Sequence, residues 1–336
     1  MRRGLQALFC AAGIAAAAIL LMSLTVRRET SLSDRVGAAV QEGAGSTIAS
    51  PHVLVRHTGN DDKYGKLSMA STDGRRTDRV ALALTCDRVS YAAGRGICLA
   101  AKRGIFISYK AVLFDRDFKA TRTIALDGSP SRTRISADGR VGAITVFVRG
   151  QAHGYAGLFS TKTTILDMAN GDILGDLEQF TTWRDGARFK AADFNFWGVT
   201  FARNSNVFYA SLRSGGATFL VRGDLGLRTL TVLRDNVECP SLSPDNRRIA
   251  FKKRVQTDIG TAWRLYVLDV ASMSERPLAS ETRSVDDQVE WLDDTRVLYA
   301  LPRKGSATTD VWVAAADGEA PPRVFLAEAE SPIVLR

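Results

Sequence analysis

The chain has 336 residues, of which 45% are hydrophobic and 24% charged, and its formal net charge is +9. This composition is typical of a globular protein and excludes a disordered or collagen-like chain. Four cysteines are too few for a disulfide-rich scaffold, so a hydrophobic core must hold the fold together. The length suits two average domains or one large domain of strands, with or without helices.

The N-terminal segment, residues 1–28, has the pattern of a membrane-targeting element. Paired arginines at positions 2–3 and 27–28 flank an uncharged, mostly apolar stretch at residues 4–26. As a helix, this stretch would extend roughly 34 Å, enough to cross the hydrocarbon core of a bilayer. A cleaved signal peptide is the alternative, but its apolar region is usually shorter and ends at a small-x-small site. The sequence therefore favours an uncleaved signal anchor.

Residues 29–50 are rich in Ser, Gly, Ala and Thr and show little hydrophobic period, which indicates a flexible linker. The body, residues 51–336, is then expected outside the cytoplasmic membrane, either tethered by the N-terminal helix or secreted after cleavage. Its basic residues form no long run interleaved with aromatic residues, so no nucleic-acid partner is expected.

The body repeats one unit: an apolar strand, a turn of Asp or Asn with Gly or Ala, and a second strand. A further turn precedes most of the units, so that each unit holds three to four strands. Such a unit is a blade of a β-propeller, and six units predict an all-β, six-bladed β-propeller. The turns of the six units centre near residues 73, 117, 170, 226, 272 and 317.

Two irregularities of the repeat carry further predictions. The segment 331–336 resembles the start of a unit, so we expect it to close the ring as the inner strand of the first blade. An insertion at Gly150–Asn195 is expected to leave the third blade as a loop. Its aromatic residues, Trp183 among them, would either bind a protein partner or cap the flank of the blade.

One repeat carries a specific resemblance. Leu242-Ser-Pro-Asp-Asn-Arg-Arg-Ile-Ala-Phe251, followed by Arg264-Leu-Tyr-Val-Leu-Asp269, resembles the repeat of TolB-like six-bladed β-propellers, whose repeats are WD40-like. The chain is also similar to actinobacterial secreted TolB-like translocation proteins, through strings such as Trp197-Gly-Val-Thr-Phe-Ala. The resemblance implies an extracytoplasmic protein that binds proteins or peptides and is not an enzyme.

The sequence shows no established catalytic or metal-binding motif. Histidine occurs only at His52, His57 and His153, and the first two are expected on opposite faces of one strand. No zinc, P-loop or nucleophile-elbow pattern is present. We therefore expect no metal and no cofactor. The alternative is a propeller enzyme of the lactonase or glycan lyase type, with an acidic site at the mouth of the channel.

Carboxylates near the starts of inner strands are the remaining candidates for a binding site. Asp286, Asp287 and Glu290 lead into one such strand, and Asp193 and Asn195 precede another. Because inner strands line the channel of a propeller, paired acids at its mouth could bind a cation or a basic peptide. The alternative is turn chemistry, since Asp readily accepts hydrogen bonds from the nearby backbone.

Cys86 and Cys98 flank a predicted hairpin centred near Ala93, so they lie nearly opposite each other. In an oxidising compartment this placement favours a cross-strand disulfide, and Cys239 remains a single thiol. The sequence thus predicts a monomeric, non-catalytic propeller that binds a protein or peptide of the cell envelope. If the anchor at residues 4–26 is uncleaved, the protein also contacts the membrane.

Overall fold

The computed structural model describes residues 40–42, 52–72, 79–104, 106–148, 160–258 and 260–336. Within these ranges the chain forms 27 strands and one short 3-10 helix, η1 (Leu177–Gln179). None of the helices in the described part is long and apolar enough to cross a membrane. The predicted targeting segment, residues 1–28, lies outside the described residues.

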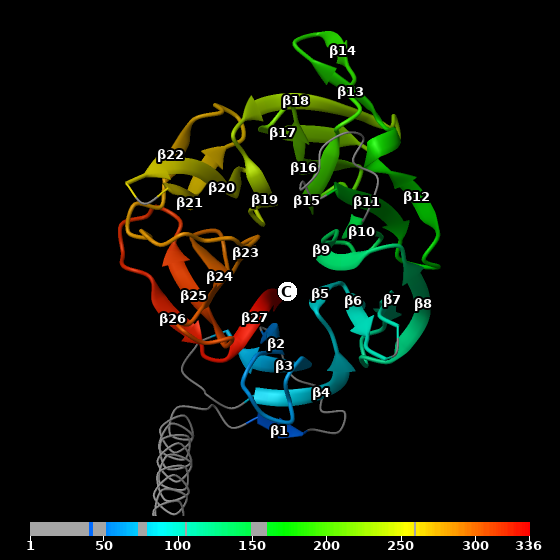
Figure 1. The fold of residues 1–336 in the computed structure, drawn as a ribbon, viewed down its shortest axis with the longest axis vertical. Helices are drawn as coiled ribbons and strands as arrows, with labels where there is room; N and C mark the ends of the chain where they lie inside the picture. The colour runs from blue at the N-terminus through cyan, green and yellow to red at the C-terminus, as the bar shows by residue number, and fades with distance from the viewer. Residues whose placement is uncertain (1–39, 43–51, 73–78, 105, 149–159, 259) are drawn as a thin grey trace, which may run out of the picture. The chain divides into compact units, whose positions relative to one another are not determined.

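The strands form six sheets arranged around a central axis as the blades of a propeller (Figure 1). The prediction of an all-β, six-bladed propeller is confirmed. From the axis outward, the first blade consists of β27 (Ala329–Leu335), β2 (His52–His57), β3 (Lys66–Ser71) and β4 (Arg79–Thr85). The second consists of β5 (Arg88–Ala92), β6 (Arg95–Lys102), β7 (Ser108–Phe114) and β8 (Ala120–Leu126). The third consists of β9 (Ser129–Ile135), β10 (Val141–Val148), β11 (Ser160–Asp167) and β12 (Ile173–Asp176).

The fourth blade carries an additional hairpin at its outer edge, made of β13 (Thr181–Arg184) and β14 (Ala187–Phe189). From the axis outward, the fourth blade consists of β15 (Asn195–Phe201), β16 (Val207–Ser214), β17 (Ala217–Asp224) and β18 (Thr229–Asp235). The fifth consists of β19 (Glu238–Leu242), β20 (Arg248–Thr257), β21 (Gly260–Asp269) and β22 (Glu275–Pro277). The sixth consists of β23 (Glu290–Trp291), β24 (Arg296–Pro302), β25 (Thr309–Ala315) and β26 (Arg323–Leu326).

The first blade combines strands from distant parts of the chain. Its inner strand, β27, pairs antiparallel with β2, so that Val334 lies opposite Val53. At its outer edge, β1 (Val40–Glu42) pairs in parallel with β4. Three residues of the segment predicted as a linker are therefore part of this sheet.

The hydrophobic core lies between the blades. Among the described residues, each of six clusters of buried apolar side chains joins two neighbouring sheets. For example, Val53 and Val55 of β2 pack with Val311 and Val313 of β25. Because both faces of a blade are covered in this way, its strands are rich in apolar residues rather than strictly alternating.

Aspartates set many of the turns between the strands. Oδ1 of Asp115 accepts hydrogen bonds from the backbone N–H groups of Asp117 and Lys119, both at 2.9 Å. Gly318 has a positive φ of 77°, and a Cβ there would lie 2.9 Å from Cα of Leu278. Glycine is required at this turn because a side chain would collide with the neighbouring backbone.

Cys86 and Cys98 form the predicted disulfide, with their Cα atoms 5.4 Å apart. Cys98 lies in β6, opposite Val89 of β5, and Cys86 lies two residues before the start of β5. Both cysteines belong to the cluster between the first and second blades. Cys239 is buried and free.

Reducing this disulfide should lower the free energy of unfolding by about 3 kcal/mol, because the bond closes a loop of about a dozen residues. Urea unfolding of the oxidised and the reduced protein measures the difference. The variant Cys239→Ala, treated in the same way, shows whether the remaining thiol contributes. A difference below about 0.5 kcal/mol would contradict the prediction.

Candidate functional site

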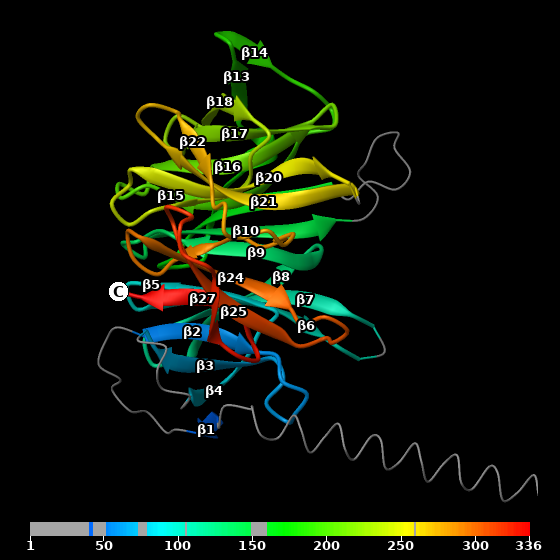
Figure 2. The same ribbon diagram turned by 90° about the vertical axis from the view of Figure 1, so that its left-hand side faces the viewer.

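The inner strands of the six blades surround the propeller axis, and they end at one common face (Figures 1 and 2). Residues from the C-terminal ends of all six strands line a single hollow of about 240 Å³, here named the strand-end hollow. The last or penultimate residues of these strands lie in its wall: Ala92, Ile135, Phe201, Leu242, Trp291 and Val334.

The wall of the strand-end hollow combines apolar and charged side chains. Phe201, Ile333 and Trp291 are buried and give it an apolar part. Three guanidinium groups and one carboxylate form the charged part. These belong to Arg134, Arg203, Arg336 and Glu290.

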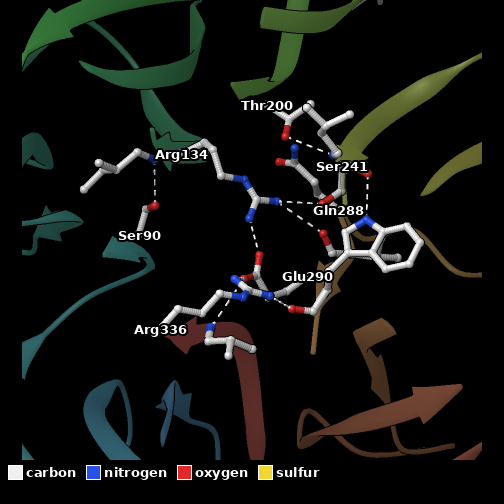
Figure 3. Close-up of polar contacts among 12 residues, drawn as sticks. Ser90, Arg134, Thr200, Ser241, Gln288, Glu290 and Arg336 are labelled. Atoms are coloured by element: carbon white, nitrogen blue, oxygen red, sulfur yellow. Dashed lines mark hydrogen bonds and ion pairs between the residues drawn. The ribbon is translucent and has the colours of Figure 1, made fainter. Parts of the chain in front are cut away.

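Glu290 lies between two arginines in this hollow, as Figure 3 shows. Its side chain is 8% exposed, and its Oε2 forms an ion pair with Arg134 of β9. Its Oε1 lies 3.4 Å from Nη1 of Arg336 and accepts a hydrogen bond from the backbone N–H of Val334, also at 3.4 Å. The third, sixth and first blades therefore meet at this carboxylate.

The two arginines differ in how far they are enclosed. Arg134 is 14% exposed, and its Nη2 donates to the carbonyl of Val289 at 3.2 Å. The Arg336 side chain is 44% exposed, and its Nη2 donates to the carbonyl of Trp291. Burying such a charged group costs several kcal/mol per ion unless partners compensate, and here each charge has one. The guanidinium of Arg336 nevertheless remains accessible from solvent.

Hydrogen bonds between uncharged groups fix the rim around the charged group. Ser90 Oγ accepts a hydrogen bond from the backbone N–H of the last residue of β9, at 2.9 Å. Thr200 Oγ1 accepts one from the last residue of β19, at 3.1 Å, and Trp291 Nε1 donates to the carbonyl of Ser241 at 2.8 Å. Each bond joins two neighbouring blades, so the hollow is held by a rigid frame.

Asp286 and Asp287, two of the predicted acids, lie before the start of β23. Asp286 forms an ion pair with Lys252, which is 3% exposed. Burial tends to raise the pKa of Asp286, but the ammonium of Lys252 holds that pKa below its usual value. Asp287 accepts hydrogen bonds from the backbone N–H groups of Gln288 and Ala300, at 2.9 and 3.0 Å.

Arginines also gather near the starts of the inner strands. A second hollow, of about 220 Å³, is lined by Arg56, Arg88 and Glu330 among others. The Glu330 carboxylate lies 2.9 Å from Arg56 and 3.4 Å from Arg88. Burial lowers the pKa of Arg88, and the neighbouring Arg132 lowers it further. Of the predicted acids before and in β23, Asp286 and Glu290 are each paired with a basic side chain, and Asp287 accepts hydrogen bonds from the backbone.

Comparisons with known proteins identify the fold. No family model matches the sequence, and no curated protein matches it. The crystal structure of TolB from Acinetobacter baumannii is similar with a TM-score of 0.60 and 15% identity, covering 85% of this chain and 66% of that chain. The fold is that of a TolB-like six-bladed β-propeller. The chain spans just under two thirds of the Acinetobacter TolB chain.

Two further structures have the same fold. Putative TolB from Agrobacterium tumefaciens is similar with a TM-score of 0.50 and 10% identity, covering 84% of this chain and 92% of that chain. A chain of a nidogen/laminin complex reaches a TM-score of 0.55 with 11% identity, covering 85% of this chain and 98% of that chain. At such identities the similarity establishes the propeller architecture.

Asp193 and Asn195 lie just before and at the start of β15, and they line a different hollow from Glu290. Asp193 accepts hydrogen bonds from Ser214 Oγ and the backbone N–H of Gly215, both at 2.7 Å. The Gly215 N–H lowers the pKa of Asp193, against a smaller opposing effect of burial. Asn195 accepts a hydrogen bond from the backbone N–H of Thr161 at 2.8 Å. Both side chains line a hollow of about 1140 Å³ between the third and fourth blades.

Trp183 lies in β13, on the hairpin at the rim of the propeller (Figures 1 and 2). Its side chain is 39% exposed. Within the predicted insertion, residues 160–167 and 173–176 form β11 and β12 of the third blade itself. The hairpin of β13 and β14 extends the fourth blade, because β13 pairs with β18. Arg184 lies over the ring of Phe219, at 4.9 Å, and Phe189 packs on the adjacent core. Residues 149–159 of the insertion lie outside the described residues.

The sequence interpretation missed the basic side chains that accompany the acids. Arg132 and Arg134 occupy alternate positions of β9, so both can face the axis, and Lys252 lies in β20. Two arginines spaced by one residue in a predicted inner strand were the available signal. Within the described residues, no group of three His, Cys, Asp or Glu side chains is arranged to hold a metal ion.

Proposed function

We propose that this propeller is a non-catalytic binding module that holds a protein or peptide partner at the strand-end hollow. The observation that carries the proposal is the composition of that hollow: buried apolar side chains surround a charged group that remains partly open to solvent. Protein-binding sites combine such an apolar centre with polar anchors on a rigid frame.

The cellular place of the propeller is part of the same proposal. The apolar segment at residues 4–26 supports export across the cytoplasmic membrane, and the disulfide between Cys86 and Cys98 fits an oxidising compartment. We place the propeller outside that membrane, in the cell envelope, tethered by the N-terminal segment. The similarity to TolB and to a propeller of a nidogen/laminin complex supports binding of proteins.

Site-specific cross-linking tests the proposal. A photoreactive amino acid at Ala137, an exposed residue that lines the strand-end hollow, should give a covalent adduct with one partner in intact envelopes. The same group at Ala187, exposed on β14 at the rim, serves as the control and should give none. The partner identified by mass spectrometry must then bind the purified full chain. Equal adducts at both positions, or none at Ala137, would contradict the proposal.

A further inference from the structure

The charge of the strand-end hollow determines which partners can bind there. Glu290, the one acidic side chain that lines it, is already engaged by Arg134, Arg336 and the N–H of Val334. The lining side chains include three guanidinium groups, of which Arg134 and Arg336 contact this carboxylate and Arg203 does not. The hollow therefore has an excess of positive charge, whereas the acids in the sequence predict a site for a cation or a basic peptide.

Arg203 contributes most of the unbalanced charge. It is exposed on the turn after β15, and its Nη2 donates to the carbonyl of Pro244 at 3.3 Å, a neutral partner. Two acidic residues of the neighbouring turns, Asp138 and Asp245, do not cancel this charge. Asp138 is paired with Arg140 and Asp245 with Arg248, so each of them is balanced by an arginine of its own turn.

From this arrangement we infer that the partner presents an acidic residue next to an apolar one. The inference rests on the proposed function and specifies its ligand. A carboxylate can receive paired hydrogen bonds from the planar guanidinium of Arg203 or Arg336. The apolar side chain beside it would pack on Phe201 and Ile333. A basic segment would face repulsion and could not replace the internal ion pairs.

Peptide display tests the inference. A random peptide library is selected against the full chain, and synthetic copies of the selected peptides are measured by fluorescence anisotropy. Selected sequences should be enriched in Asp or Glu next to an apolar residue. Replacing the acid by its amide should weaken binding by about tenfold or more, and raising the salt concentration should weaken it as well.

Three variants locate the binding. Arg203→Glu should weaken the acidic peptides by at least about tenfold. Arg188→Glu makes the same charge change on exposed β14 and should leave binding unchanged. Ala137→Trp blocks the hollow without changing its charge and should abolish binding.

The outcomes separate the inference from the proposed function. Peptides that are blocked by Ala137→Trp but are neutral or basic would overturn the inference and leave the proposed function standing. If no peptide is selected, or if the selected peptides are insensitive to Ala137→Trp, both fail. Acidic peptides that respond equally to Arg203→Glu and Arg188→Glu bind through general charge attraction, and this result also overturns the inference.

Discussion

Replacing Glu290 by alanine should lower the free energy of unfolding of the propeller by about 3–5 kcal/mol. The substitution leaves the Arg134 guanidinium, 14% exposed, without its carboxylate partner. It also removes the acceptor of the Val334 N–H. The expected cost comes mainly from the uncompensated buried charge, since the lost side-chain volume is small. Urea unfolding followed by tryptophan fluorescence measures the change.

A second variant distinguishes charge from packing. In Glu290→Met combined with Arg134→Leu, neither buried charge remains, and most of the lost stability should return. Glu319→Ala removes an exposed carboxylate on a turn and should change stability by less than about 0.5 kcal/mol. A loss below about 1 kcal/mol for Glu290→Ala, or no recovery in the double variant, would contradict this account.

The group around Glu290 connects blades that are not neighbours in the ring. Packing between adjacent blades accounts for the six apolar clusters. The ion pair with Arg134 instead joins the sixth blade to the third across the axis. Such a buried charged group contributes little net stability compared with apolar residues, so its presence here is consistent with a role in binding.

The architecture could be predicted from the sequence because it depends on local patterns. Asp115 and Gly318 lie in turns whose geometry requires these residue types, and such turns recur at regular spacing. The disulfide was predictable for the same reason, since Cys86 and Cys98 are joined by a single hairpin.

The charge of the site could not be predicted in the same way. Arg134 and Glu290 are 156 residues apart, and no local pattern relates them. Lys252 of β20 is charged but buried, and its partner Asp286 lies before β23 of the next blade, so their pairing depends on how the two blades pack. The hairpin of β13 and β14 joins the fourth blade through a parallel pairing, which repeat counting does not reveal.

Glu178 lies in η1 and lines the hollow between the third and fourth blades. Burial raises the pKa of its carboxyl to about 8, from an ordinary value of 4.5. The backbone N–H of Thr163 donates to this carboxyl at 3.1 Å and only partly offsets the effect of burial. The folded protein therefore retains this proton at a pH where the unfolded chain has lost it.

The stability of the propeller should consequently depend on pH through Glu178. Between about pH 5 and 8 the unfolded state binds fewer protons at this residue than the folded state, so stability falls as pH rises, by up to about 1.4 kcal/mol per pH unit. Glu178→Gln keeps an acceptor for the Thr163 N–H but cannot ionise. Its stability relative to the wild type should rise by about 4 kcal/mol from pH 5 to 8. Urea unfolding of both proteins at each pH measures this difference, with Glu319→Gln as the exposed control. Parallel stability curves for the wild type and Glu178→Gln would show that the carboxyl ionises normally in the fold.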